Sequence, residues 1–214
     1  MDKYTRLENG IIKQTEIINK KCEYNIKYSS TYNDYGEKGR ILSHMRLSFL
    51  LASIKKIPNS ILDIGYGNGD FLNACTRCIS SCNGSDISKY PLSKEINMID
   101  FQDISKQHFD VVCFFDSLEH FDDINFIKHL ECDYIFITLP WCHFYSEEWF
   151  MDWKHRRPDE HLWHFNKEAL LKFFKENGYE KINCGIPFED IIRKDDRYKP
   201  NILTGIFKKQ YKNI

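Results

Sequence analysis

The sequence predicts an α/β protein with a doubly wound, mostly parallel sheet and helices on both of its faces. Short apolar runs alternate with longer helical patterns from about residue 58 onward, which is typical of a parallel sheet flanked by helices. A glycine-rich turn follows the first apolar run, and an acidic residue ends the second. The run FDVVCFF at 109–115 is apolar at nearly every position, as expected when both faces of a strand are covered.

Size and charge limit the protein classes to consider. The 214 residues are 42% hydrophobic, which is enough for one domain over 1–214 and too much for a disordered chain. Lys and Arg number 30 against 31 Asp and Glu, so the basic excess of duplex-binding proteins is missing and nucleic acid is a disfavoured partner. No apolar run could cross a membrane, and no signal peptide begins the sequence. We therefore expect a cytoplasmic protein without a membrane partner, and its oligomeric state stays open.

The first part of the chain is expected to be a helical cap, 1–57, that precedes a sheet core at 58–214. The cap contains a predicted amphipathic helix at 40–56, whose apolar residues recur at helical spacing: Ile41, Met45, Phe49 and Leu50. Pro58 marks the change to the alternating pattern of the core.

The core elements follow from apolar runs and turn residues. Parallel strands are predicted at 60–64, 83–87, 96–99, 109–115 and 132–139. Helices are predicted at 70–80, 122–130 and 166–177, the last with Asn166 as N-cap and Gly178 after its end. Two closing strands are expected at 180–184 and 202–207. An insertion at 141–165 separates the fifth strand from the last helix and contains all four tryptophans and four of the eight histidines.

The turn after the first strand, LDIGYGNGDF, exposes backbone N–H groups at the start of a helix. Glycines at 65, 67 and 69 let a ligand approach the backbone closely. The G-x-G-x-x-G pattern of dinucleotide-binding proteins is missing its third glycine, which disfavours a nicotinamide oxidoreductase. Asp63, two residues before Gly65, would repel a pyrophosphate, so a ligand with a free ammonium group fits this loop better.

An acidic residue ends the second predicted strand, in the segment GSDIS. Asp86 lies 21 residues beyond Gly65 and is followed by Ile87. A carboxylate at this point of a βαβ unit can accept hydrogen bonds from both hydroxyls of a ribose. The loop and the acid together therefore predict a nucleoside-containing ligand.

These motifs resemble those of the class I S-adenosylmethionine-dependent methyltransferases. LDIGYGNGDF resembles the first motif of that family, GSDIS its ribose-binding motif and FDVVCFFDSLEHFDD its fourth-strand region. The D-x-L-E-H segment and HLWHFNKEALLKFFKENGYE are similar to the group that includes ubiquinone-type and sugar O-methyltransferases. The resemblance covers about 60–185. It implies a seven-stranded sheet with an antiparallel final hairpin, S-adenosylmethionine as cofactor and S-adenosylhomocysteine as product.

The resemblance also assigns cofactor contacts. Gly65 and Gly67 would pack against the methionine part, Asp63 would hold its ammonium group and Asp86 would bind the ribose. Asp100, or else Asp103, would contact the adenine. The expected set of cofactor-binding residues is Asp63, Gly65, Gly67, Gly69, Asp86, Ile87, Asp100, Phe101, Asp116 and Ser117.

A hydroxyl acceptor of the methyl group requires a general base, and histidine is the usual base near neutral pH. His161 is the first candidate because it matches a position of the family. His120, after the fourth strand, is the second, and His143 in the insertion is the third. The insertion follows the carboxyl end of the fifth strand, so its aromatic residues are expected to lie near the acceptor.

We expect no metal site. Cys75, Cys78 and Cys82 have the spacing of one helix face, and a buried cysteine behaves as a small apolar residue. The series His155, His161 and His164 has no carboxylate at a ligand spacing.

The sequence thus predicts an enzyme that methylates a small polar acceptor, at an oxygen of a sugar, nucleotide sugar or similar metabolite. Two other functions stay open. The chain could be a tRNA or protein methyltransferase, or a non-catalytic S-adenosylmethionine-binding partner subunit.

Overall fold

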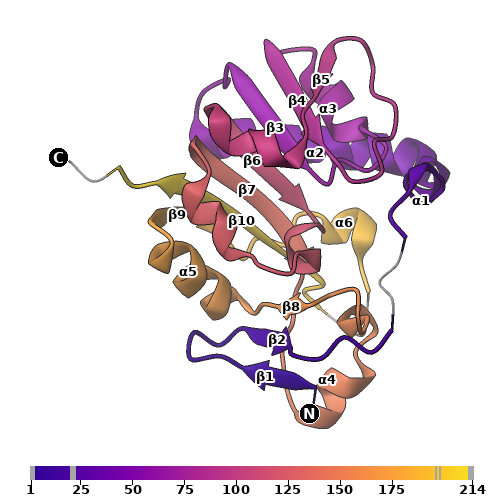
Figure 1. Ribbon diagram of the computed structural model, residues 1–214, viewed down its shortest axis with the longest axis vertical. Coiled ribbons are helices and arrows are strands. Elements are labelled where there is room, and N and C mark those ends of the chain that lie inside the picture. Colours follow the sequence, from indigo (N-terminus) through magenta and orange to yellow (C-terminus); the bar gives the residue numbers. More distant parts are fainter. Residues whose placement is uncertain (1–2, 20–22, 196, 198, 212–214) are drawn as a thin grey trace.

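The computed structural model describes residues 3–19, 23–195, 197 and 199–211, and it confirms the predicted α/β class. Its main feature is one seven-stranded sheet (Figure 1). All strand pairs of this sheet are parallel except those that β10 makes with β7 and β9. In spatial order the strands are β5 (Ile96–Met98), β4 (Ser81–Ser85), β3 (Ser60–Ile64), β6 (Phe109–Phe115), β7 (Cys132–Pro140), β10 (Ile202–Lys209) and β9 (Tyr179–Cys184).

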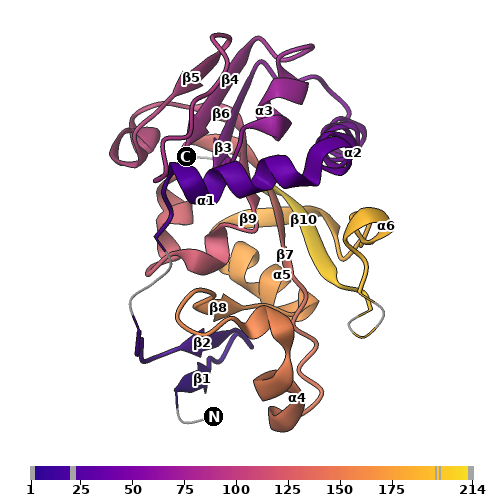
Figure 2. The ribbon, with the colours of Figure 1, turned by 90° about the vertical axis from the view of Figure 1, so that its right-hand side faces the viewer.

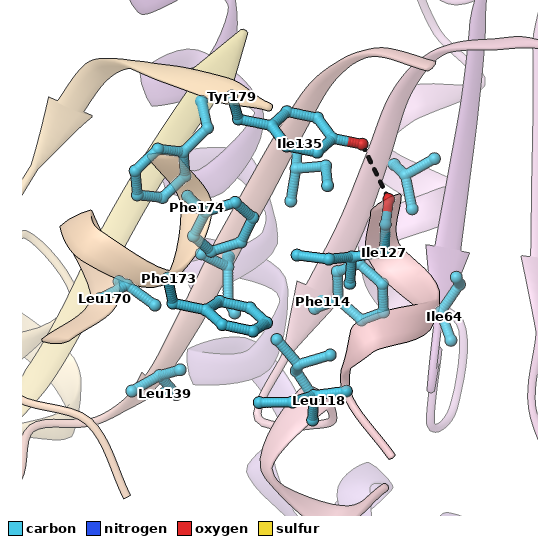
Figure 3. Close-up of a cluster of buried hydrophobic side chains, with 14 of the residues drawn as sticks. Ile64, Phe114, Leu118, Ile127, Ile135, Leu139, Leu170, Phe173, Phe174 and Tyr179 are labelled. Atoms are coloured by element: carbon cyan, nitrogen blue, oxygen red, sulfur yellow. Dashed lines mark hydrogen bonds between the residues drawn. The ribbon is translucent and has the colours of Figure 1, made fainter. Parts of the chain in front are cut away.

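Helices cover both faces of the sheet. Neighbouring residues of a strand point to opposite faces, so one strand can contribute to two core clusters. Leu62 of β3 packs in one core cluster with α5 (Lys167–Glu176), and Ile61 in another with α2 (Gly36–Ile54) and α3 (Asp70–Cys75). Figure 3 shows the first cluster, in which the Tyr179 hydroxyl donates to the Ile127 carbonyl oxygen at 3.0 Å. The predicted N-cap of α5 is present, since the Asn166 side chain accepts from the Ala169 N–H.

The expected helical cap at 1–57 is wrong for its first part. A hairpin of β1 (Tyr4–Arg6) and β2 (Ile12–Gln14) forms there, and β2 pairs with β8 (Trp163–His164) of the insertion. Figure 2 shows this small sheet and α4 (Glu147–Asp152) apart from the large sheet. The physical reason is long-range packing, since Tyr4 and Ile12 are buried against Phe150 and Trp153 of the insertion. The local sequence around Tyr4 and Ile12 does not indicate this contact.

Three further expectations change in detail. The predicted helix at 122–130 is a single 3-10 segment, η4 (Asn125–His129), because the Asp123 side chain accepts from the Asn125 N–H and starts a tight turn. The helix predicted at 70–80 ends at Cys75, and Cys82 lies in β4, so the three cysteines do not share a helix face. Cys75 and Cys82 are buried and Cys78 is exposed. The buried face of α2 consists of Ser43, Leu47, Leu50 and Ile54, with Ile41 exposed.

The remaining elements are short. Two of them, α1 (Ile26–Ser30) and η1 (Thr31–Tyr35), connect the hairpin to α2, and η3 (Leu118–His120) follows β6 after Asp116 and Ser117. Within the described ranges, no helix is long and apolar enough to span a membrane. These elements are α1 (Ile26–Ser30), η1 (Thr31–Tyr35), η2 (Phe101–Lys106), η3 (Leu118–His120), η5 (Lys154–Arg156) and α6 (Asp190–Arg193).

Candidate active site

A cavity of about 630 Å³ opens at the carboxyl ends of β3, β4, β5 and β6. This is where ligands bind in doubly wound sheets. Nine of the residues predicted to take part in a site line this cavity: Gly65, Gly67, Asp86, Ile87, Asp100, Phe101, Asp116, Ser117 and His120.

The glycine loop closes one side of the cavity. Gly65 has φ +82°, and its N–H donates to the Ser85 carbonyl oxygen at 2.7 Å. A Cβ on Gly65 would lie 2.6 Å from Cβ of Ser117, and one on Gly67 would lie 3.2 Å from the Tyr32 ring. A side chain at Gly65 would clash with Ser117, whereas at Gly67, which has φ +59°, it would be strained and would press on the Tyr32 ring. Gly69 does not line the cavity and is the N-cap of α3.

Two aspartates lie at and under the loop. The Asp86 carboxylate accepts from the Gly67 N–H at 3.0 Å and from the Ser88 N–H at 2.7 Å, so its oxygens are held in place at the cavity wall. Asp63 is 2% exposed and lies beneath the cavity, and burial raises its pKa to about 7. The Oδ1 atom of Asp63 has no hydrogen-bond partner among the described residues.

Asp100 and Phe101 form the opposite rim. Asp100 pairs with Lys89, which also lines the cavity, at 2.9 Å. Phe101 packs edge-on against Phe126 and obliquely against Phe121, with ring centroids 5.3 Å apart in both pairs. An aromatic ring and a carboxylate therefore stand side by side at this end. Asp103, the alternative to Asp100, pairs with Lys106 and is not part of the lining.

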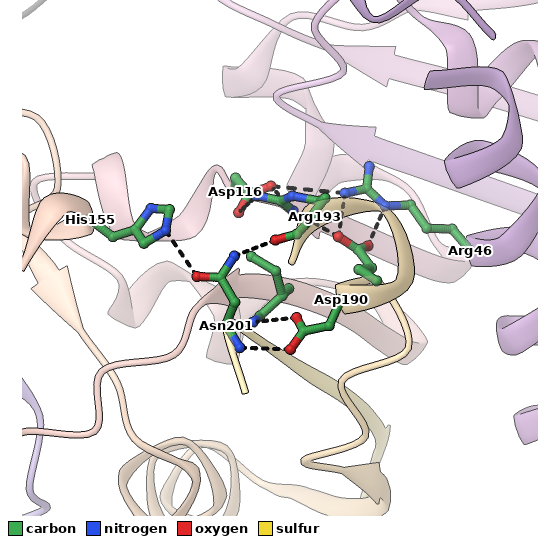
Figure 4. A network of polar contacts seen from close by, with 8 residues as sticks. Arg46, Asp116, His155, Asp190, Arg193 and Asn201 are labelled. Atoms are coloured by element: carbon green, nitrogen blue, oxygen red, sulfur yellow. Dashed lines mark hydrogen bonds and ion pairs between the residues drawn. The ribbon is translucent and has the colours of Figure 1, made fainter. Parts of the chain in front are cut away.

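A four-charge network holds Asp116 (Figure 4). Asp116 has φ +51°, and its two oxygens accept from Arg193 at 2.7 and 3.0 Å. Arg193 and Arg46 both pair with Glu189, which is fully buried. Burial alone would raise the pKa of Asp116, but Arg193 and Arg46 outweigh it and lower the pKa. The carboxylate is therefore charged where it meets the cavity.

Glu119 and His161, which are buried, and the half-buried His120 form a compact group next to Asp116, named here the histidine cluster. One side-chain ligand atom from each residue lies within 4.8 Å of the others. The rings of His120 and His161 are perpendicular, with centroids 4.6 Å apart. Only His120 of the three lines the cavity, and His161 lies behind it.

Burial keeps the histidine cluster uncharged. It lowers the pKa of His120 to about 4 and that of His161 well below the ordinary range, and it raises the pKa of Glu119. The His120 Nδ1 atom shares a hydrogen bond of 2.8 Å with the Tyr24 hydroxyl, and the His161 Nδ1 atom one of 2.7 Å with the His155 carbonyl oxygen. The Nδ1 hydrogen bonds therefore fix the orientation of both imidazole rings.

His143, the third predicted base, lies elsewhere. Its Nε2 atom bonds to the Pro200 carbonyl oxygen at 2.7 Å, and its ring stacks on Trp141 and Tyr145. It is not among the described residues that line the cavity.

The sequence analysis missed the tyrosines that cover the cavity. Tyr24, Tyr28 and Tyr32 line it from the segment before α2, and their rings meet edge to face. Their spacing of four residues is that of one helix face and was a usable signal. Arg193 had no such signal, because it reaches Asp116 from 77 residues away.

Two comparisons relate the chain to known proteins, whereas no curated protein sequence matches it. The sequence model of a family described as methyltransferase domain matches residues 37–183. The plantazolicin methyltransferase BpumL in complex with S-adenosylhomocysteine has a similar structure, with a TM-score of 0.59 and 19% identity over 86% of this chain and 90% of that one. Magnesium protoporphyrin IX methyltransferase (ChlM) from Synechocystis PCC 6803 is similar with a TM-score of 0.54 and 14% identity, over 78% of this chain and 83% of that one. A putative methyltransferase in complex with the Haloferax volcanii Trm112 activator is similar with a TM-score of 0.57 and 12% identity, over 86% of this chain and 98% of that one.

Proposed function

The chain belongs to the methyltransferase domain family, as a class I, S-adenosylmethionine-dependent enzyme, and from this premise we propose that it methylates an oxygen of a small polar acceptor. A sugar or a nucleotide sugar is the acceptor class we favour. The observation that carries the proposal is the position of His120, which stands in the wall of the same cavity as Gly67 and Asp86.

The residues present fit the cofactor. The loop around Gly65 and Gly67 leaves backbone exposed where a Cβ would fill the space, and Asp86 presents a fixed carboxylate for two ribose hydroxyls. Asp63 has an unpartnered buried oxygen under the loop, suited to the ammonium group of the methionine part. Asp100 and Phe101 would hold the adenine, and Asp116 and Ser117 would line the methionine side.

S-adenosylmethionine supplies a methyl group on a sulfonium, so the chain has to orient the acceptor and handle the proton of its hydroxyl. We assign this proton to the histidine cluster, with His120 at the surface and His161 behind it. The cavity of about 630 Å³ is covered by Tyr24, Tyr28 and Tyr32, which favours a small acceptor over a macromolecular one.

We further place the chain in the D-x-L-E-H group of the family. In this segment Leu118 packs in the core, whereas Asp116, Glu119 and His120 belong to the cavity wall or to the histidine cluster. We also propose that 1–214 works as one domain. Pairing of β2 with β8 supports this, because it joins the N-terminal segment to the insertion at the acceptor side.

The experiment is a thermal-shift titration with S-adenosylmethionine, S-adenosylhomocysteine and NADH. A ligand at 100 times its Kd adds about 2.7 kcal/mol to the free energy of unfolding, or roughly 5–11 °C in Tm for a chain of this size. We expect this shift with the two adenosyl ligands and not with NADH. Asp86→Ala should remove it, whereas Asp103→Ala, which changes an acid outside the cavity, should keep it. A shift with NADH alone would refute the proposal.

A further inference from the structure

We propose that Glu119, His120 and His161 bind a divalent transition-metal ion at the acceptor end of the cavity, an inference that rests on the proposed function. Two imidazoles and one carboxylate are a donor set that first-row ions such as Zn²⁺ accept, with coordination positions left open for a substrate. Their ligand atoms all lie within 4.8 Å of one another. Ligands of one such ion are about 4 Å apart or less, so small side-chain adjustments bring them together.

The Glu119 carboxyl group is the observation that points to a bound cation. The residue is 1% exposed, and neither of its carboxylate oxygens has a hydrogen-bond partner among the described residues. An ionised carboxylate in this position has no hydrogen-bond or ion-pair partner among the described residues, with Arg193 and Arg157 acting on it only from a distance, and a protonated one lacks an acceptor for its O–H. A cation bound between Glu119 and the two histidines would supply the missing partner of the carboxylate oxygens.

The histidines are held in an orientation that suits metal binding. The His155 carbonyl oxygen can only accept, so the His161 Nδ1 atom carries the proton and the Nε2 atom keeps its lone pair. This outer hydrogen bond is the usual support of a metal-binding histidine. The Tyr24 hydroxyl shares a hydrogen bond with Nδ1 of His120, and we assign the other ring nitrogen of His120, Nε2, to the ion.

The position of the site specifies the acceptor more closely. His120 lines the cavity together with Asp116 and Asp122, so the open coordination positions of the ion face the space left for the acceptor. An acceptor with two neighbouring oxygens, such as a vicinal diol, could occupy two of these positions. Coordination lowers the pKa of a bound hydroxyl, so with the ion present its proton leaves to water, and the two histidines act as ligands of the ion in place of the proton acceptors assigned above. The oxygen lone pair then forms the O–C bond while the C–S pair stays on sulfur, which leaves a methyl ether and a neutral thioether.

No sequence spacing indicates this group, because His161 is 41 residues from His120 in the chain. The proposal therefore departs from the expectation that the chain has no metal site. It also differs from the series His155, His161 and His164, since His155 bonds to Asn201 and the pKa of His164 is lowered by burial in another cluster.

The test is direct metal binding by the full-length, tag-free chain. Co²⁺ is titrated into the metal-free protein and followed by visible absorption, and Zn²⁺ is titrated by calorimetry. We expect one equivalent of each ion to bind, with Zn²⁺ displacing Co²⁺. Glu119→Gln and His161→Ala should each weaken binding at least about tenfold. The control is His129→Ala, which removes an exposed histidine of η4 and should bind as the wild type does.

Several outcomes would overturn the metal site: no binding by the wild type, or equal affinity in the wild type, Glu119→Gln and His161→Ala. Far-UV circular dichroism checks that each variant is folded, and His161→Gln replaces His161→Ala if the latter unfolds. S-adenosylhomocysteine binding is measured in the same samples. If that ligand binds and the ions do not, the metal site fails and the proposed function stands. If the wild type does not bind S-adenosylhomocysteine, the proposed function itself fails.

Discussion

Gly65→Ala tests whether the cofactor loop depends on the close approach of Gly65 to Ser117. Gly65 has φ +82°, where an L-residue costs about 1–2 kcal/mol. The new Cβ would also lie 2.6 Å from Cβ of Ser117, whose hydroxyl donates to the Ile64 carbonyl oxygen at 2.6 Å and cannot move without losing that bond. Overpacking of this kind costs a further 1–3 kcal/mol, roughly. We expect the free energy of unfolding to fall by about 2–5 kcal/mol.

Gly178→Ala is the matched control for Gly65→Ala. Gly178 follows α5 with φ +85°, and no described heavy atom beyond its chain neighbours would lie within 4 Å of a new Cβ. Backbone strain is then the whole cost, about 1–2 kcal/mol. Urea denaturation without ligand should therefore place Gly65→Ala about 1–3 kcal/mol below Gly178→Ala, which corresponds to roughly 2–12 °C in Tm. Equal losses in the two variants would refute the steric argument.

Three further predictions concern buried groups. Burial raises the pKa of Asp63 to about 7, so the folded chain keeps a proton that the unfolded chain loses near pH 4. As the pH rises from about 4 to about 7, the free energy of unfolding should therefore fall, by up to about 4 kcal/mol. Denaturation curves of Asp63→Asn should show no such slope. Arg193→Met removes one of the two cations of the network, so Asp116 and Glu189 are left with Arg46, and it should cost about 3–5 kcal/mol in urea denaturation. Adding Glu189→Gln should recover part of the loss. Phe174→Ala removes a fully buried ring that stacks on another at 3.9 Å and should cost about 3–5 kcal/mol, whereas an unchanged Tm would contradict the packing.

The cofactor side of the site could be predicted because its residues follow local patterns. Gly65 and Gly67 come directly after an apolar strand, and Asp86 follows the next strand. Strand ends of a parallel sheet meet at one edge, so a reader of the sequence can place these residues together without any long-range contact. The strand at 109–115 was predicted to the residue for the same reason, since a continuous apolar run is its own signal.

The acceptor side could not be predicted in the same way. Pairing of β2 with β8 and of Arg193 with Asp116 joins segments far apart in the chain, and neither segment carries a mark of its partner. The cap at 1–57 was expected from the helical pattern at 40–56, and its first part is a hairpin instead. Tyr4 and Ile12 of this hairpin are buried by side chains of the insertion.

The two sides of the cavity therefore differ in how they are built, and this has a consequence for function. The proposed cofactor side is formed at the ends of β5, β4, β3 and β6, which are neighbours in the large sheet. The acceptor side needs three separate segments: Tyr24 from the region before α1, His120 from η3 and His161 from the insertion. His161 is anchored through the backbone, because the Leu162 N–H donates to the Glu119 carbonyl oxygen at 2.8 Å and the Gln14 N–H to the Leu162 carbonyl oxygen at 2.8 Å. We therefore expect changes in the N-terminal hairpin to shift the histidine cluster without altering the loop at Gly65 and Gly67.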